Sequence, residues 1–173
     1  MTLHGSLLDV HGVGTLLMGP SGIGKTECAL ELLTRGHRLV ADDVVELHST
    51  SDGRLIGAAP ERIRHYMEIR GLGIVSVPDL FGPGAVREEM PIELVCRLVK
   101  WREGVEYERV GLERPMEEIA GVALPSLTLP ARPGGSMATV VDVAVREHRL
   151  RSEGVAGARR LDERLIREMS GGE

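Results

Sequence analysis

The sequence is poor in cysteine. Cys28 and Cys96 are the only two cysteines in 173 residues. They are too few and too far apart for a disulfide framework or a zinc-binding motif. We therefore interpret both as buried thiols of a protein that works in a reducing compartment.

Aromatic residues and basic charge are also scarce. The chain has one tryptophan, two tyrosines and one phenylalanine, and its 26 acidic residues outnumber its 21 lysines and arginines. Nucleic-acid binding favours a basic face and aromatic side chains on which bases stack. We therefore expect no nucleic-acid partner.

Long apolar runs are missing. No stretch approaches the ~18 apolar residues of a membrane span, and Met1–Val10 lacks the basic segment and apolar core of a signal peptide. We expect a soluble cytoplasmic protein, or a domain cut from one, with no membrane partner. The length predicts one domain over residues 1–173, large enough to fold without disulfides or a structural metal.

Short apolar runs and helical spacing predict an α/β order. Two strands, Ser6–Val10 and Gly14–Met18, are joined by a tight glycine turn, and a helix follows over Lys25–Arg35. A strand over His37–Asp42 comes next, and Val44–Ser49 continues it or pairs with it. The later predictions are a strand at Arg54–Ala59, helical or irregular chain at Pro60–Ile69, a long loop over 70–86, a long strand at Met90–Trp101 and a strand fragment with a stiff loop over 124–135.

The C-terminal part predicts two helices over Thr139–Met169, broken at Gly154. In the second, apolar residues fall near one face: Val155, Leu161, Leu165, Ile166 and Met169. We favour the interpretation that this stripe packs on the protein's own core. The alternative is that part of it contacts a partner or another subunit.

The strongest motif is the segment GPSGIGKT, which matches G-x-x-x-x-G-K-[ST] and lies between a predicted strand and a predicted helix. Backbone N–H groups of such a loop surround phosphate oxygens, and the helix N-terminus adds a positive dipole end. Lys25 can reach the β- and γ-phosphates, and the Thr26 hydroxyl can bind Mg²⁺. The nucleotide-binding residues are Gly19, Pro20, Ser21, Gly22, Ile23, Gly24, Lys25 and Thr26.

Two adjacent acids follow the next predicted strand. A strand–helix–strand crossover makes the two strands parallel, so the loop and the pair Asp42 and Asp43 lie at one edge of the sheet. Carboxylates there can hold Mg²⁺ or accept a proton from a hydroxyl group. On extended chain they face opposite ways, and the sequence leaves open which one faces the nucleotide. A simple turn-capping role is less consistent with the shared edge. Phosphoryl transfer needs these parts, and the short interval between loop and acids is unlike ordinary P-loop ATPases.

Several segments together resemble the catalytic, C-terminal domain of bacterial HPr kinase/phosphorylase. They are LHGSLLDVHGVGTLLMGPSGIGKTECALELLTRGHRLVADDVVEL, EIRGLGIVSVPDLFGPGAVR, YERVGLE and LPARPG. The resemblance implies an α/β fold in which helices flank a P-loop-containing mixed sheet, similar to the nucleotide-binding core of phosphoenolpyruvate carboxykinase.

The resemblance also implies a function. Such enzymes use ATP or pyrophosphate with Mg²⁺ to phosphorylate a regulatory serine of HPr, a carrier protein of the sugar phosphotransferase system. They also remove that phosphate with inorganic phosphate, which yields pyrophosphate. Family members are typically homohexamers, and their C-terminal helices help to contact HPr.

The matching positions imply roles for individual residues. The catalytic positions are His4, Lys25, Asp43 and Arg109, and Asp43 is the proton acceptor in phosphorylation and the proton donor in the reverse reaction. The metal-binding positions are Thr26, Glu68 and Asp42. A loop linked mainly to dephosphorylation comprises Pro130, Ala131, Arg132, Pro133, Gly134 and Gly135.

Two departures from the family pattern stand out. Gly135 occupies a position where the family usually has an arginine, so phosphorolysis or its response to sugar phosphates is expected to be altered. The family's N-terminal domain is absent, which indicates an excised catalytic domain or a short natural form. Two other functions stay open: a P-loop kinase for a small metabolite, and a nucleotide-gated binding module without turnover.

Overall fold

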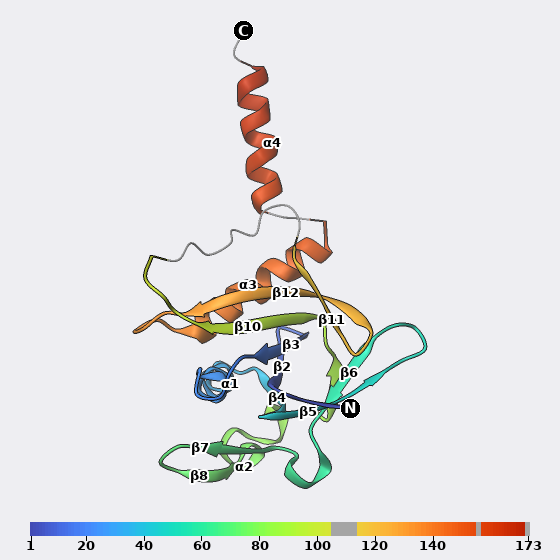
Figure 1. The fold of residues 1–173 in the computed structure, drawn as a ribbon, viewed down its shortest axis with the longest axis vertical. Coiled ribbons are helices and arrows are strands. Elements are labelled where there is room, and N and C mark those ends of the chain that lie inside the picture. Colours follow the sequence, from blue (N-terminus) through green and yellow to red (C-terminus); the bar gives the residue numbers. More distant parts are fainter. Residues whose placement is uncertain (105–113, 155–156, 172–173) are drawn as a thin grey trace.

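The computed structural model describes residues 1–104, 114–154 and 157–171. A six-stranded mixed sheet forms its centre, with strand order β11-β12-β10-β3-β2-β4 (Figure 1). Its strands are β2 (Ser6–Val10), β3 (Val13–Met18), β4 (Arg38–Ala41), β10 (Leu94–Lys100), β11 (Met116–Ile119) and β12 (Val122–Ala131). The predicted hairpin of β2 and β3, with its turn at His11 and Gly12, is confirmed.

Both faces of this sheet are buried around β2, β3 and β4, which explains why these strands are nearly continuous apolar runs. Successive residues point to opposite faces. Leu8 and Leu17 therefore pack into one apolar cluster, together with helix side chains. Their neighbours Leu7 and Leu16 pack into a second cluster on the other face.

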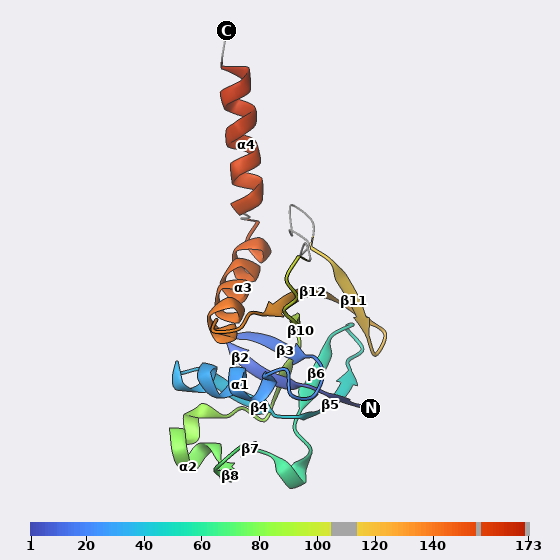
Figure 2. The ribbon, with the colours of Figure 1, turned by 60° about the vertical axis from the view of Figure 1, so that its left-hand side comes forward.

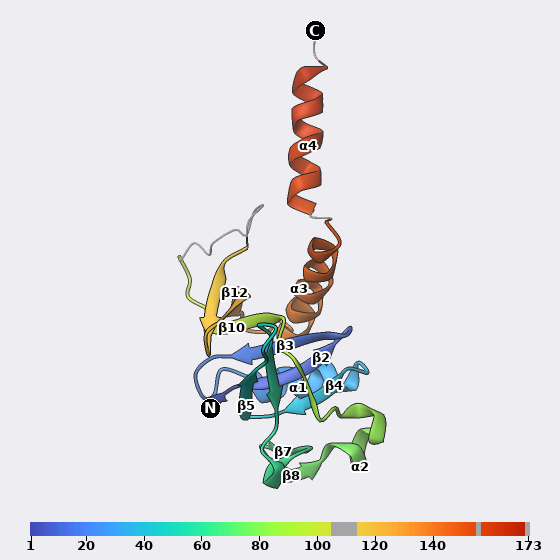
Figure 3. The ribbon, with the colours of Figure 1, turned by 90° about the vertical axis from the view of Figure 1, so that its right-hand side faces the viewer.

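The first face is covered by helices α1 (Lys25–Thr34) and α3 (Met137–Ser152), which contact each other (Figure 3). The predicted helix over Lys25–Arg35 is confirmed to within one residue. Beside α1 lies a hairpin of β7 (Tyr66–Ile69) and β8 (Gly73–Ser76), which is followed by the short helix α2 (Val77–Phe81). In the described part of the chain, no helix is both long and apolar enough to cross a membrane.

The second face carries a four-stranded sheet of order β1-β5-β6-β9. Its strands are β1 (Thr2–His4), β5 (Val44–Ser49), β6 (Leu55–Ala58) and β9 (Glu89–Pro91). The strand at Val44–Ser49 therefore neither extends β4 within one sheet nor pairs with it. Instead β5 pairs with β1 and β6, because the chain changes direction at Asp43.

The predicted long strand over Met90–Trp101 is wrong, because the chain changes sheets within it. β9 belongs to the four-stranded sheet and β10 to the six-stranded one. At the crossing, the Ile92 N–H donates to the Leu55 carbonyl and the Glu93 N–H to the Gly14 carbonyl, both at 2.8 Å. A Cβ on Gly14 would lie 1.8 Å from the Pro91 carbonyl oxygen. The crossing therefore needs glycine at that position.

The predictions for residues 60–86 are only partly right. Pro60–Ile69 contains a single 3₁₀ turn at Glu61–Ile63, followed by strand β7. The expected loop over 70–86 contains strand β8 and helix α2. The buried side chain of Met67 explains why a regular hairpin forms here, because it anchors the hairpin in the apolar cluster beneath α1.

The two C-terminal helices are confirmed as α3 and α4 (Gly157–Ser170), but the expected packing of the second is wrong. α4 projects away from the rest of the molecule in two views (Figures 1 and 2). Four of its stripe residues are exposed, namely Leu161, Leu165, Ile166 and Met169. Val155 lies outside the described residues. An amphipathic pattern indicates a buried face without saying what buries it.

Candidate functional site

Four strands of the central sheet run parallel and end at one edge. β10 is parallel to both β3 and β12. β2 is antiparallel to both β3 and β4, so these two are also parallel to each other, although β2 lies between them. In open α/β sheets, ligands bind beyond the carboxyl ends of the strands. The P-loop follows β3, the two aspartates follow β4 and residues 132–135 follow β12. Pro130 and Ala131, predicted as part of the loop, are the last paired residues of β12; the name 130–135 loop is kept for the whole predicted segment.

The P-loop has the geometry of an anion-binding turn. Gly24 precedes α1 with a φ of 110°, a value open mainly to glycine. A Cβ on Gly19 would lie 2.6 Å from the Leu98 carbonyl oxygen, so the loop leaves β3 in close contact with β10. The Lys25 Nζ donates to the carbonyl oxygens of Gly19 and Pro20, at 2.6 and 3.1 Å. The ammonium group is thus held at the mouth of the loop.

Asp42 lies within reach of the P-loop helix. The Thr26 hydroxyl is 3.5 Å from its Oδ1 and 3.4 Å from its Oδ2. The carboxylate is buried, with 8% of the residue exposed. Burial raises the pKa of Asp42, the neighbouring Asp43 charge raises it further, and the Ser6 and Thr26 hydroxyls oppose the shift. The carboxylate is therefore short of positive charge and suited to hold a cation.

Asp43 differs from its neighbour in conformation and exposure. Its φ is 66°, so the expectation of extended chain with alternating side chains is wrong at this residue. The Val44 N–H donates to the Asp42 carbonyl at 2.8 Å, and the Gly5 N–H donates to the Asp43 carbonyl at 3.0 Å. Asp43 is exposed where Asp42 is buried. The two carboxylates therefore have different environments, one suited to a metal and one to exchange of a proton with a substrate.

His4 lies beside this turn. It ends β1, where the strand register places it opposite Val44, the residue after Asp43. Its side chain is exposed. A residue that looks like a frayed terminus in the sequence is thus fixed by strand pairing near the acids. Its catalytic role stays a prediction.

Glu68 and Arg109 are the remaining residues predicted to bind metal or to act in catalysis. Glu68 is exposed on β7, a strand that contacts α1. Its role as a metal ligand stays a prediction. Arg109 lies outside the described residues, in the segment 105–113 between β10 and β11.

The 130–135 loop lies next to the P-loop. Both line an open pocket of about 870 Å³ with side chains of α1 and α3. The lining includes Ile23 and Gly24 of the P-loop, and Arg132, Gly134 and Gly135 of the other loop. The Arg132 guanidinium lies 5.3 Å from the centre of the Trp101 ring, within the range of a cation–π contact.

Ser6 is a site residue that the motif analysis missed. It is fully buried at the start of β2, and its hydroxyl donates to the Asp42 Oδ1 at 2.8 Å. Because β2 lies between β3 and β4, Ser6 ends up between the loop and the acids. A polar residue at the head of an otherwise apolar strand was the available signal.

This geometry agrees with comparisons to known proteins. The family described as HPr Serine kinase C-terminal domain matches residues 1–165. The chain belongs to this family. A relative named HPr kinase/phosphorylase from Caldanaerobacter subterraneus subsp. tengcongensis is 48% identical over 169 residues, which cover 98% of this chain and 55% of the relative. A relative of the same name from Leptospira biflexa serovar Patoc is 49% identical, covering 94% of this chain and 51% of the relative.

A solved structure is similar too. The HPr(Ser) kinase/phosphatase from Coxiella burnetii superposes with a TM-score of 0.81 at 36% identity, covering 89% of this chain and 93% of that one. The predicted α/β class, a mixed sheet with flanking helices, is confirmed. The chain spans about half the length of the two named curated relatives. Membership of the family is therefore established, whereas a complete activity is a matter of proposal.

Proposed function

We propose that this chain catalyses both reactions of an HPr kinase/phosphorylase. It transfers the γ-phosphoryl group of ATP to the regulatory serine of HPr, with pyrophosphate as an alternative donor. It also transfers the phosphoryl group of phosphoserine-HPr to inorganic phosphate. The observation that carries the proposal is the contact between the P-loop and the paired acids, in a chain about 48% identical to proteins named HPr kinase/phosphorylase.

The residues at this contact fit Mg²⁺. The ion prefers oxygen ligands and takes few of them from protein, the rest being water and phosphate. The Thr26 hydroxyl and the Asp42 carboxylate supply such oxygens 3.4 Å apart. In the proposal these two groups hold the metal, with Glu68 as a further ligand. Mg²⁺ would neutralise phosphate charge there.

In the forward direction, Lys25 leaves the loop carbonyl groups and pairs with the β- and γ-phosphates. The HPr serine oxygen forms a bond to the γ-phosphorus, and the bond from that phosphorus to the bridging oxygen of ADP breaks. Asp43 takes the serine proton. Lys25 and Arg109 stabilise the negative charge that spreads over the transferred group.

In the reverse direction, the same groups act in the opposite order. An oxygen of inorganic phosphate forms a bond to the phosphorus of phosphoserine, the bond to the serine oxygen breaks, and pyrophosphate is released. Asp43 returns its proton to the serine oxygen, as microscopic reversibility requires. The exposed position of Asp43 supports this role, because its carboxylate is open to a protein substrate.

The 130–135 loop belongs to the reverse reaction in this proposal. Its position across the pocket from the P-loop supports that assignment. Gly135 brings no side-chain charge to bind phosphate, so we infer a weaker phosphorolysis than kinase activity. His4 tunes or relays protons beside Asp43, and its strand register supports this role.

The assembly and location are also proposals. We infer a homohexamer in the cytoplasm. The family resemblance supports the hexamer, and two buried free cysteines are consistent with a reducing compartment. Light scattering behind size-exclusion chromatography measures the assembly directly, and a monomer would contradict it.

The test follows the mass of purified HPr. HPr is incubated with this chain, Mg²⁺ and ATP, and inorganic phosphate is then added. We expect the mass to rise by one phosphoryl group and to fall again with release of pyrophosphate. HPr whose regulatory serine is replaced by alanine is the control and stays unmodified.

Two outcomes would point to the other functions. Phosphate that accumulates on a metabolite while HPr stays unmodified would indicate a small-molecule kinase. Tight ATP binding without turnover, with HPr and Mg²⁺ present, would indicate a nucleotide-gated binding module. Either result would overturn the proposal.

A further inference from the structure

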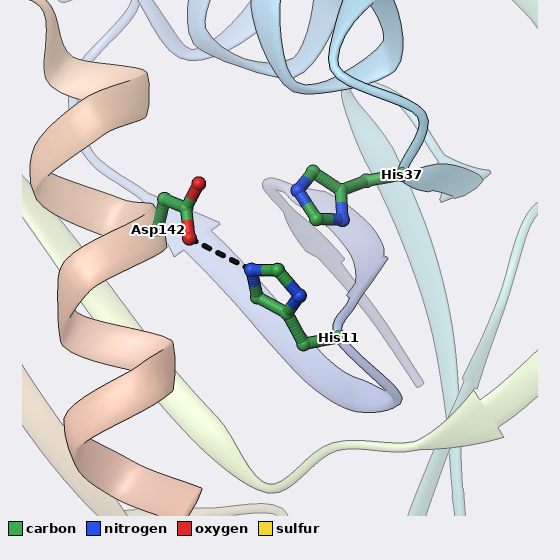
Figure 4. Close-up of side chains that lie close together, drawn as sticks. All are labelled: His11, His37 and Asp142. Carbon is green, nitrogen blue, oxygen red and sulfur yellow. Dashed lines mark hydrogen bonds and ion pairs between the residues drawn. The ribbon is translucent and has the colours of Figure 1, made fainter.

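Three potential metal ligands meet at the end of the sheet away from the P-loop. His11 lies in the β2–β3 turn, His37 precedes β4, and Asp142 lies on α3 (Figure 4). One ligand atom of each lies within 4.8 Å of the others. The His11 Nε2 is 2.7 Å from the Asp142 Oδ1, and the two imidazole rings meet edge to face with centroids 4.6 Å apart.

This cluster is distinct from the candidate functional site. His11 precedes β3, and the P-loop follows it, so the six residues of β3 separate the two. At ~3.3 Å a residue that is roughly 20 Å. His37 and Asp42 likewise flank the two ends of β4. None of the three residues has a part in the proposed phosphoryl transfer.

We propose that His11, His37 and Asp142 bind a zinc ion. Two imidazole nitrogens and a carboxylate oxygen form a ligand set typical of Zn²⁺, with water as the fourth ligand. Mg²⁺ prefers oxygen ligands alone, so it competes poorly here.

The geometry needs only small adjustments. Ligand atoms about 2.0–2.1 Å from zinc in a tetrahedron are about 3.3 Å from one another. The present separations between ligand atoms do not exceed 4.8 Å. Side-chain rotations that bring these atoms closer by about 1.5 Å or less would therefore complete the site. The His11 turn is already fixed, because its φ is 53° and the following Gly12 N–H donates to the Asp9 Oδ1 at 2.8 Å.

Two cations compete for the carboxylate. The Arg146 Nε donates to the Asp142 Oδ1 at 2.7 Å, and an Arg35 nitrogen lies 4.0 Å from its Oδ2. Arg146 has 64% of its side chain exposed and can move into solvent. Asp142 can therefore present one oxygen to the metal while the other keeps Arg35. The competition weakens zinc binding without blocking it.

Bound zinc would hold three segments together. α3 begins directly after the 130–135 loop, and Asp142 is in its second turn. Zinc would tie this helix to the β2–β3 turn and to the start of β4. It would therefore stabilise the fold and fix the helix that supports the loop.

The test is a titration of the metal-stripped protein with ZnCl₂ in the presence of excess Mg²⁺, in which calorimetry measures the binding. CoCl₂ gives a second measurement, because tetrahedral cobalt absorbs strongly in the visible range. The variants are His11→Asn and His37→Gln. Asparagine tolerates the left-handed conformation that His11 adopts, so the turn is kept. His48→Asn is the control, because His48 is exposed on β5, far from the cluster in the chain.

We expect one equivalent of zinc to bind to the wild type and to raise its Tm. Both variants should bind it at least about tenfold more weakly, whereas His48→Asn should bind it as the wild type does. Zinc held by the catalytic acids would be unaffected by these substitutions. The two thiols do not compete, since both are buried with pKa values raised to about 12.

The proposal is overturned if the wild type binds no more zinc than His11→Asn, or if cobalt gives no tetrahedral spectrum. Thermal unfolding in EDTA shows whether each variant is folded. If His11→Asn is unfolded, the zinc affinity of His37→Gln is compared with that of the wild type instead. The titration contains no HPr or nucleotide, so its result is independent of the proposed phosphoryl transfer.

Discussion

The Thr26 hydroxyl lies 3.4 Å from the Asp42 Oδ2, although 16 residues separate the two in the sequence. Thr26 is the second residue of the helix after the P-loop, and Asp42 follows β4. Their contact makes the phosphate-binding loop and the paired acids parts of a single site. It also distinguishes the two acids, because Asp42 is buried against the Thr26 hydroxyl and Asp43 remains exposed.

Replacing Ser6 with alanine should weaken Mg²⁺ binding, although Ser6 is not one of the proposed metal ligands. Its hydroxyl holds the Asp42 carboxylate in place from within the core. Partners of metal ligands typically contribute about 10- to 100-fold in affinity or activity. We expect the Mg²⁺ concentration for half-maximal HPr phosphorylation to rise by that factor, and the rate to recover at saturating Mg²⁺.

Ser49→Ala, at the exposed end of β5, is the control for Ser6→Ala and should leave the Mg²⁺ dependence unchanged. A Ser6→Ala enzyme with a lower maximal rate but an unaltered Mg²⁺ requirement would show that Ser6 does not act through the metal.

Replacing Asp43 with asparagine should nearly abolish both reactions while nucleotide binding persists. A positioned general base contributes about 10²- to 10⁴-fold, so HPr phosphorylation and phosphorolysis should fall by that factor. Asparagine tolerates the φ of 66° at this position, so the turn should survive. Retained kinase turnover, measured with normal ATP affinity, would refute the role of Asp43 as the base.

Replacing Lys25 with alanine should impair both binding and rate. A hydrogen bond to a charged group contributes about 1.5–3 kcal/mol, or about 10- to 150-fold. We expect the Kd for ATP to rise by that factor and the maximal rate to fall as well. Arg54→Ala removes an exposed charge from the β5–β6 turn and should change neither. Normal HPr phosphorylation by Lys25→Ala would mean that the loop has been misinterpreted.

The sequence was sufficient to predict the parts of the site that are determined by residues close together in the chain. The P-loop motif, the helix after it and the aspartates beyond β4 lie within one strand–helix–strand unit. The handedness and direction of that unit follow from general rules. Those rules placed Thr26 and Asp42 at one edge even though β2 separates their strands.

The features that the sequence predicted wrongly or missed depend on residues that are distant in the chain. The break between β9 and β10 is set by Leu55 and Gly14, which lie far from Ile92 in the chain. The contribution of Ser6 depends on which strand lies between β3 and β4. The exposed stripe on α4 follows from the absence of a covering element among the described residues, which helical spacing does not encode.

The ion pair between Arg97 and Glu117 gives a prediction that depends on pH. The Arg97 Nε lies 2.5 Å from the Glu117 Oε1, and Ser126 lies 3.5 Å from that oxygen. The pair joins β10 to β11 across β12, the strand that leads to the 130–135 loop. The hydrogen bond from Arg97 lowers the pKa of Glu117 below its ordinary value of 4.5.

Because the pKa of Glu117 is lower in the folded state, the carboxylate stabilises the fold above pH ~4.5 and loses that effect as pH falls through the lowered pKa. Glu117→Gln should therefore reduce the free energy of unfolding by about 1 kcal/mol at pH 7, a modest value because Arg97 is partly exposed. The difference from wild type should shrink as the pH is lowered below about 4.5. Urea unfolding at pH 7 and at a series of lower pH values measures it, with the exposed neighbour Glu118→Gln as control. A difference that does not change with pH would mean that packing, and not the ion pair, connects these strands.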